Sequence, residues 1–287
     1  MGKRRRFDLK KSLFLLPNMI TLSSIFCGFD SIRVSAAATR QEDYYLAALL
    51  IVFAMFFDIL DGRVARATKT QSAFGLQIDS LADVISFGAA PAMLVYQWTL
   101  HRLDRGPVPI GLIGSFVFIA CGAIRLARFN VLSMGEQGKP SKPGKYIVGL
   151  PIPGAAGILV SIIVANHAAA GVFGGVEYVW PLFFVTLGLS FLMVSTIRFR
   201  SFKDVKLNAR TVLFVAFAVG SSAVVSYKLK PQFVLVWLLG FYVLLGIFES
   251  LWQLPGRLRE RAALAAQAEG GSDSVPPPDV PSPPAQG

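Results

Sequence analysis

The chain has 287 residues, of which 54% are hydrophobic and only 16% are charged, with a net charge of +11 and a mean hydropathy of +0.56. An ordinary soluble domain carries about 25% charged residues. The composition therefore excludes that class and indicates an integral membrane protein. The Lys and Arg residues stand between the apolar runs, so membrane topology accounts for the positive charge and we expect no nucleic acid as a partner.

The N-terminal residues 1–14 are basic, with Phe7, Leu9, Leu13 and Phe14 interleaved. This pattern predicts a short segment that lies on the anionic inner leaflet of a membrane. A solvated tail that serves only to orient the first span is the alternative. At the other end, residues 253–287 are expected to form a cytoplasmic tail. Its last part, 266–287, is rich in Ala, Gly, Ser and Pro and predicts disorder.

Between these ends, residues 15–252 predict an all-α transmembrane domain, a helical bundle of about eight spans. A hydrocarbon core of about 30 Å takes roughly 20 helical residues to cross, and the apolar runs approach that length. We place them at 15–36, 44–66, 74–99, 108–131, 149–167, 178–197, 210–227 and 232–252.

The positive charges predict the orientation. Twenty Lys and Arg residues fall in the termini and loops on one side of these spans, and five fall on the other side. Since cytoplasmic segments carry the excess of positive charge, both termini are expected in the cytoplasm. A bacterial cytoplasmic membrane is the expected location.

Four aspartates surround the loop between the second and third spans. Asp58 and Asp61 are spaced by three residues and Asp79 and Asp83 by four, so each pair occupies one helix face. Ionisable residues inside a membrane are costly and usually functional. The alternative is that Arg63, Arg66 and Lys69 satisfy them as ordinary helix-end charges.

Four converging carboxylates would repel one another unless cations neutralise them. A set of oxygen ligands without His or Cys favours a hard cation, Mg²⁺ or Mn²⁺. Such ions bridge phosphate oxygens in phosphoryl transfer. The residues thus predict a cytoplasm-facing phosphoryl-transfer site with two divalent ions, without naming a substrate.

These aspartates belong to a longer pattern, Asp58-x-x-Asp61-Gly62-x-x-Ala65-Arg66, followed at fixed spacing by Gly75, Asp79 and Asp83. The pattern resembles the full signature of the CDP-alcohol phosphotransferase family. The resemblance implies a six-helix core, here extended by two C-terminal helices, and a homodimer.

The resemblance also implies roles for single residues. Asp58, Asp61 and Asp79 would bind the metal. Asp83, the fourth member of the acidic set, would complete the set of metal-binding aspartates and would also be the base that takes the hydroxyl proton of the acceptor. The pocket for the cytidine diphosphate group would be formed by Asp58, Asp61, Gly62, Ala65, Arg66, Gly75 and Asp79.

Further segments resemble the phosphatidylserine synthase branch of that family. They lie at 16–21, 26–29, 74–91, 125–130, 149–153 and 201–204. This resemblance implies transfer of a phosphatidyl group from CDP-diacylglycerol, held in membrane lipid, to L-serine with release of CMP. Glycerol phosphate, inositol phosphate or choline as acceptor is the alternative within the family. An ion-coupled transporter or a prenyltransferase is the alternative outside it.

Two arginines near the cytoplasmic end of the fourth span are candidates for binding serine. Arg125 and Arg128 lie one helical turn apart, and a guanidinium group matches a carboxylate or a diphosphate in geometry. The alternative is that each is a helix-end Arg that reaches for the membrane interface.

Overall fold

The computed structural model describes residues 9–70, 72–133, 146–169 and 171–200, and towards the C-terminus 220–222, 224–228, 231 and 233–248. The chain divides into two units, 1–246 and 247–287, and of the second only Ile247 and Phe248 are described. The tail expected at 253–287 and the first eight residues of the expected interfacial segment lie outside the described residues.

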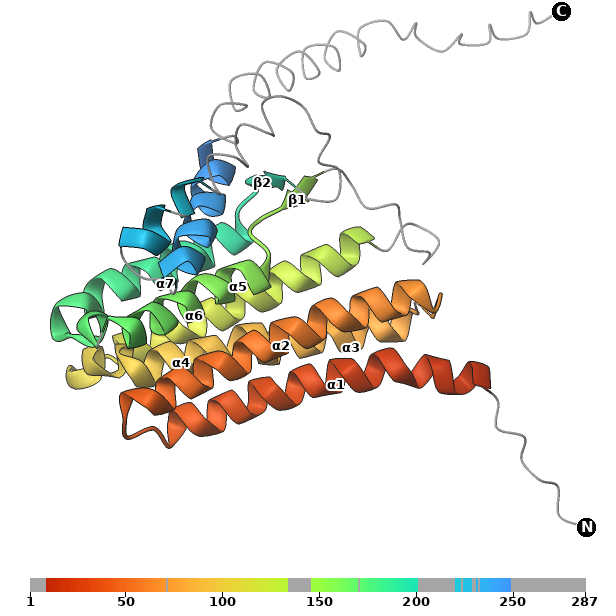
Figure 1. Ribbon diagram of the computed structural model, residues 1–287, viewed down its shortest axis with the longest axis horizontal. Helices are drawn as coiled ribbons and strands as arrows, with labels where there is room; N and C mark the ends of the chain where they lie inside the picture. Colours follow the sequence, from red (N-terminus) through yellow and green to blue (C-terminus); the bar gives the residue numbers. More distant parts are fainter. Residues whose placement is uncertain are drawn as a thin grey trace, which may run out of the picture. The chain divides into compact units, whose positions relative to one another are not determined.

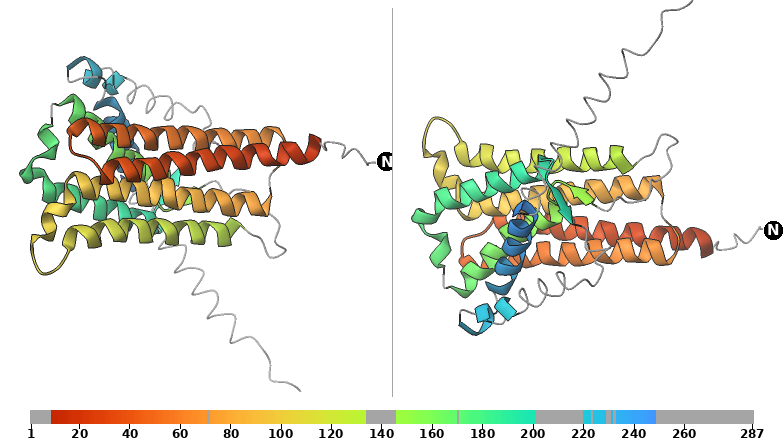
Figure 2. Two further views of the ribbon diagram at one scale, coloured as in Figure 1. Left: turned by 90° about the horizontal axis from the view of Figure 1, so that it is seen from below. Right: turned by 90° about the horizontal axis from the view of Figure 1, so that it is seen from above.

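The first unit is built from helices that run side by side (Figures 1 and 2). Their bounds are α1 Leu9–Ala36, α2 Gln41–Ala67, α3 Ala73–Asp83, α4 Ala90–Trp98, α5 Ile110–Ser133, α6 Ile152–Ala168 and α7 Val179–Val194. Between them lie a π-helical turn, η1 (Val84–Ala89), and the 3-10 turns η2 (Leu100–Arg105), η3 (Val172–Gly174) and η4 (Val176–Tyr178). Helical residues follow at 220–222, 224–228 and 233–248.

Among the described residues, four helical stretches are long and apolar enough to cross a membrane: Gln41–Ala67, Ala73–Trp98, Ile110–Leu132 and Val176–Val194. The helices Ile152–Ala168 and Phe233–Phe248 are apolar but shorter. The helical membrane protein expected from the composition is confirmed at this level, whereas the count of eight spans stays a prediction. Large apolar side chains on the outer faces of α1 and α2, such as Phe26 and Phe56, are more than half exposed, as expected for surfaces that face lipid.

The core forms where small side chains let helices approach one another closely. Ala47, Ala48, Ile51 and Ala54 on α2 are fully buried, and α2 packs chiefly against α1 and α6. Such small residues are typical of helix contacts in membranes. At one end of the bundle this packing gathers the C-terminal end of α2, the beginning of α3 and the C-terminal end of α5 (Figure 1).

A short antiparallel sheet departs from the all-α prediction. β1 (Tyr146–Val148) pairs with β2 (Arg198–Arg200), Ile147 lying opposite Phe199. Directly after β1, Gly149 takes a φ of +78°, a conformation that favours glycine, and its N–H donates to the Ile197 carbonyl at 2.8 Å. Strands of three residues are too short to leave an alternating pattern that sequence analysis could recognise.

Candidate active site

Three of the four predicted aspartates converge. Asp58 and Asp61 come from α2, Asp79 comes from α3, and one carboxylate oxygen of each lies within 4.8 Å of the other two. Asp61 is buried, and Asp58 and Asp79 are half-buried. A set of three carboxylates at this separation, with oxygen donors alone, fits a hard divalent cation. The donor set supports the predicted metal site but not the kind or number of ions.

Asp83 stands outside this group of three. It is the last residue of α3, and its carboxylate interacts electrostatically with Asp58, Asp79 and Asp61 and also with Arg125 on α5. Its Oδ1 atom is buried without a hydrogen-bond partner among the residues that the structure describes. A buried carboxylate oxygen without a partner is costly. Asp83 therefore has the three carboxylates of the acidic cluster and the guanidinium of Arg125 as charged neighbours.

Thr21 on α1 is a site residue to which sequence analysis assigned no role. Its hydroxyl donates to Asp61 Oδ2 at 2.6 Å and lies 3.1 Å from the Pro17 carbonyl, and the residue is buried. It falls within the 16–21 segment that resembles the phosphatidylserine synthase branch, which is the one signal that could have drawn attention to it. Partners of this kind orient a carboxylate and tune its binding of metal.

The π-helical turn η1, which follows Asp83, is hydrogen-bonded to α1, and α1 is hydrogen-bonded to α2 at the same place. Ser86, fully buried in η1, donates to the Ser24 carbonyl of α1 at 3.0 Å, and the Ser24 hydroxyl donates to the Ala54 carbonyl of α2 at 3.2 Å. Gly28 lets α1 approach, because a Cβ there would lie 2.7 Å from Ser86 Cα. Single π-turns inside helices often mark functional sites, and this one begins immediately after Asp83.

The small residues of the motif lie beside the acidic cluster. Among the described residues, a Cβ on Gly62 would meet only the guanidinium of Arg66, at 3.5 Å. Arg66 is exposed and Ala65 half-buried. Gly75 lies in the first turn of α3, where its N–H donates to the capping Ser72 hydroxyl at 3.0 Å.

The two candidate arginines have different surroundings although they share a helix. Arg128 donates to three main-chain carbonyls, those of Val194 at 2.9 Å, Val148 at 3.3 Å and Ser195 at 3.1 Å. It therefore ties β1 and the end of α7 to α5. Arg125 is 7% exposed, interacts with Asp83, and lies with its guanidinium carbon 5.9 Å from the centre of the Phe129 ring. Within the described part of the chain its Nε atom has no hydrogen-bond partner.

Helices α3 and α5 are joined next to these groups. The Asn130 amide donates to the Ser80 hydroxyl at 2.9 Å. Ser80 follows Asp79, and Asn130 lies two residues beyond Arg128. This pair fixes how α5 meets α3 and hence how Arg125 faces Asp83.

Comparison with known proteins shows the family to which the chain belongs. Residues 14–192 match the family model described as CDP-alcohol phosphatidyltransferase. A CDP-diacylglycerol–serine O-phosphatidyltransferase from Helicobacter pylori is 38% identical over 240 residues, which cover 84% of this chain and 92% of that protein. Proteins of the same name are similar too: one from Mycobacterium leprae is 31% identical over 275 residues (95% of this chain, 84% of that protein), and one from Bacillus subtilis is 34% identical over 188 residues (66% and 91%).

Proposed function

Because the chain belongs to the CDP-alcohol phosphatidyltransferase family, we infer that it is an enzyme that transfers the phosphatidyl group of CDP-diacylglycerol to L-serine. Relatives that bear the name of this activity match it at 30–38% identity over most of its length. The observation that carries the inference is the convergence of Asp58, Asp61 and Asp79, with Asp83 beside them, at the positions of the family signature.

The acidic cluster would hold the divalent cation that this chemistry needs. Mg²⁺ or Mn²⁺ suits its carboxylate oxygens, and we propose two ions per site on Asp58, Asp61 and Asp79. A bound cation of this kind neutralises negative charge on phosphate oxygens during transfer. Thr21 keeps Asp61 oriented for this role through the hydrogen bond of 2.6 Å. The helix surface at Gly62, with Ala65, Arg66 and Gly75, is the proposed site of the cytidine diphosphate group.

Asp83 is the proposed base. Its buried carboxylate takes the hydroxyl proton of serine as the serine oxygen forms a bond to the phosphorus that carries diacylglycerol. The bond from that phosphorus to the oxygen of CMP breaks, and CMP leaves with the bonding electrons. The unpartnered Oδ1 of Asp83 supports this assignment. Both acyl tails stay in the bilayer throughout, which suits a site at the end of a helix bundle.

Arg125 is the better placed of the two arginines to bind the carboxylate of serine. Arg128 already donates to three carbonyls, whereas Arg125 is buried beside Asp83 with its Nε unpartnered in the described structure. A guanidinium group recognises a carboxylate through paired hydrogen bonds. We therefore propose that Arg125 holds serine and that Arg128 supports the loop around it.

The charge distribution supports a site that opens to the cytoplasm, with both termini on the same side. The family resemblance supports a homodimer.

A panel of acceptors tests the proposed function. Purified full-length protein in micelles with CDP-diacylglycerol and Mn²⁺ is given serine, glycerol phosphate, inositol phosphate or choline in turn, and CMP and the product lipid are measured. We expect rapid CMP release and phosphatidylserine with serine alone. Asp83→Asn should lower the rate by about 10²–10⁴-fold, since that is what a positioned base contributes.

The matched control for that variant is Asp30→Asn. Asp30 pairs with Arg33 on α1 and has no described contact with the acidic cluster, so this variant should keep the wild-type rate. Faster CMP release with another alcohol than with serine would refute the serine assignment. If Asp83→Asn released CMP at the wild-type rate, Asp83 would not be the base.

A further inference from the structure

Asp79 is brought to the acidic cluster by a helix that hardly touches the helix of the other two aspartates. Both α2 and α3 pack against α1, and direct packing between α2 and α3 is slight in the described part of the chain. Carboxylate oxygens of Asp58 and Asp61 on α2 and of Asp79 on α3 nevertheless lie within 4.8 Å of one another. Like charges at this separation repel one another before a cation binds. The position of α3 must therefore be set by contacts on its other faces.

One such contact is the hydrogen bond between Ser80 of α3 and Asn130 of α5. The Asn130 amide nitrogen donates to Ser80 Oγ at 2.9 Å, and Asn130 Oδ1 lies 3.2 Å from the same hydroxyl. That hydroxyl also lies 3.1 Å from the Leu76 carbonyl, one turn earlier in α3. Ser80 and Asn130 are both half-buried. Because Asp79 precedes Ser80 in one hydrogen-bonded helix, a shift of Ser80 carries Asp79 with it.

The helix that carries Asn130 is itself held on its other sides. A Cβ on Gly114 would lie 2.5 Å from a side-chain atom of α7, and a Cβ on Gly122 would lie 2.5 Å from a side-chain atom of α6, so α5 is in close contact with both helices. One turn from these contacts towards Asn130, the Arg128 guanidinium donates to three main-chain carbonyls at β1 and at the end of α7. Helix α5 is therefore a fixed support from which Asn130 reaches α3.

We propose that Asn130 and Ser80 are positioning residues for the divalent cation: their hydrogen bond keeps α3 at the distance from α2 at which Asp79 can share an ion with the two aspartates of α2. The proposal rests on the proposed function, in which the three aspartates bind the metal. It assigns a role in metal binding to α5, a helix that carries no acidic residue.

The test is Mn²⁺ binding to the purified full-length protein in micelles, without either substrate, followed through the electron paramagnetic resonance signal of free Mn²⁺. Ser80→Ala removes the hydroxyl and should raise the Kd for Mn²⁺ about 2- to 10-fold, as the loss of one hydrogen bond does. Asn130→Ala should have an effect of the same size. The double variant should bind Mn²⁺ no more weakly than either single variant, because both changes remove one contact. Ser80→Thr keeps a hydroxyl and should restore the wild-type Kd.

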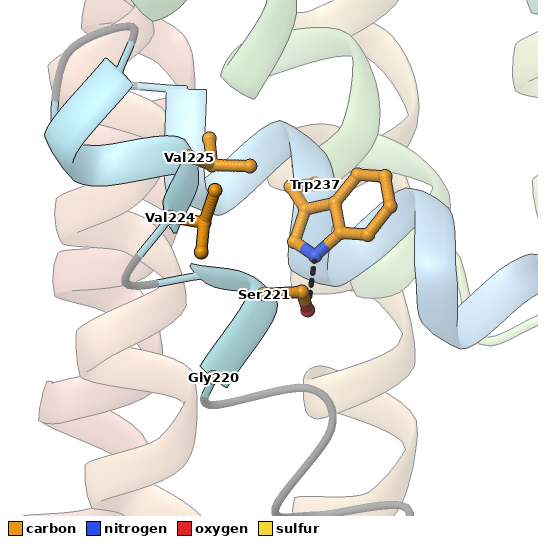
Figure 3. Close-up of a pocket in the computed structure, with 5 residues that line it drawn as sticks. All are labelled: Gly220, Ser221, Val224, Val225 and Trp237. Atoms are coloured by element: carbon orange, nitrogen blue, oxygen red, sulfur yellow. Dashed lines mark hydrogen bonds between the residues drawn. The ribbon is translucent and has the colours of Figure 1, made fainter.

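Two other hydrogen bonds between separate segments provide matched controls. Ser31 of α1 is fully buried and donates to the Ala47 carbonyl of α2 at 2.8 Å, about three helical turns from Asp58. The Trp237 indole N–H donates to the Ser221 hydroxyl at 3.0 Å, beside a shallow apolar hollow of about 540 Å³ (Figure 3). Ser31→Ala and Trp237→Phe each lose a hydrogen bond, as Ser80→Ala does. Both should keep the wild-type Kd for Mn²⁺, since neither bond involves α3 or the acidic cluster.

A wild-type Kd in Ser80→Ala overturns the proposal. So does an equal loss of Mn²⁺ affinity in Ser31→Ala, which would trace the effect to general stability, and so do effects of Ser80→Ala and Asn130→Ala that simply add. Asp79→Asn separates these failures from a failure of the proposed function. Wild-type Mn²⁺ binding by Asp79→Asn would mean that the acidic cluster is not the metal site, which overturns both. Lost binding in Asp79→Asn beside a wild-type Kd in Ser80→Ala would overturn the positioning role alone.

Discussion

At the scale of single residues, the acidic cluster depends on a neighbour that carries no charge. Thr21 is separated from Asp61 by 40 positions in the chain, yet its hydroxyl donates to that carboxylate at 2.6 Å. A hydroxyl in this place limits rotation of Asp61 and offsets part of the cost of burying it. The carboxylates supply the charge of the site, and Thr21 supplies part of its geometry.

Thr21→Val removes this hydroxyl with little change of shape. We expect the Mn²⁺ concentration that gives half-maximal CMP release to rise about 10- to 100-fold, the usual effect of losing such a partner of a metal ligand. Thr21→Ser, which restores a hydroxyl, should recover most of the affinity. Ser23→Ala is the control, since the Ser23 hydroxyl donates only to the Met19 carbonyl of its own helix at 3.0 Å among the described contacts. An unchanged metal requirement in Thr21→Val would contradict the role of Thr21.

At the scale of elements, the stretch from Ala73 to Trp98 carries site residues in one part and packs in the core of the bundle in the other. Its first part, α3, carries Asp79 and Asp83, and its last part, α4, is packed in the core with Leu94 and Val95 buried. The π-helical turn η1 between them changes the angular register of the two parts. Ser86 and Gly28 hold that turn against α1, so the direction of Asp83 depends on how the turn that follows it packs against α1.

Gly28→Ala should disturb this contact. The added Cβ would lie 2.7 Å from Ser86 Cα, which is main-chain and cannot turn aside. Such overpacking costs typically about 1–3 kcal/mol, and we expect a lower melting temperature together with a fall in kcat as Asp83 moves. Ser86→Ala should not rescue the variant, because the clash with the main chain of residue 86 persists.

Gly188→Ala is the matched control, since no atom of the described residues lies within 4 Å of a Cβ at that helical position in α7. Replacing an unhindered helical Gly by Ala stabilises by about 0.4–1 kcal/mol, so this variant should melt at the wild-type temperature or above it. Wild-type kcat and stability in Gly28→Ala would show that the turn tolerates displacement of α1.

At the scale of the whole molecule, the helix packing places the acidic cluster and the two arginines towards one end of the bundle. The C-terminal end of α2, the beginning of α3 and the C-terminal end of α5 lie together there (Figure 1). Twenty of the Lys and Arg residues belong to segments predicted on the side of that end. We therefore expect the nucleotide and the acceptor to enter from the cytoplasm.

Single cysteines test this orientation in a background in which Cys27 and Cys121 are replaced by Ala. Ser141→Cys lies outside the described residues, in a loop predicted inside, and Gly106→Cys lies between η2 and α5, at the opposite end from the acidic cluster. A membrane-impermeant thiol reagent should label position 141 only in inside-out vesicles and position 106 only in right-side-out vesicles. Sealed right-side-out vesicles should make no product from external serine and CDP-diacylglycerol. Labelling of position 141 from outside would invert the proposed topology.

The amino-acid sequence alone predicts the membrane class and the four aspartates of the candidate site. It also predicts the family, because the signature from Asp58 to Asp83 is written in 26 consecutive positions. Spacing of three and four residues on a helix translates directly into a shared face, so no long-range information was needed to predict that Asp58 and Asp61, or Asp79 and Asp83, act together.

The neighbours of these residues, in contrast, depend on how the helices pack in the folded protein. Arg125 and Arg128 look equivalent in sequence. In the structure, Arg128 donates hydrogen bonds to the carbonyls of Val148 and Val194, whereas Arg125 interacts electrostatically with Asp83. The hydrogen bond of Thr21 and the position of the π-helical turn depend likewise on how separate helices pack. In a membrane, hydrophobicity sets which residues are helical but hardly distinguishes one packing of those helices from another. Close contacts between small residues, together with hydrogen bonds between helices, decide the arrangement and hence the site.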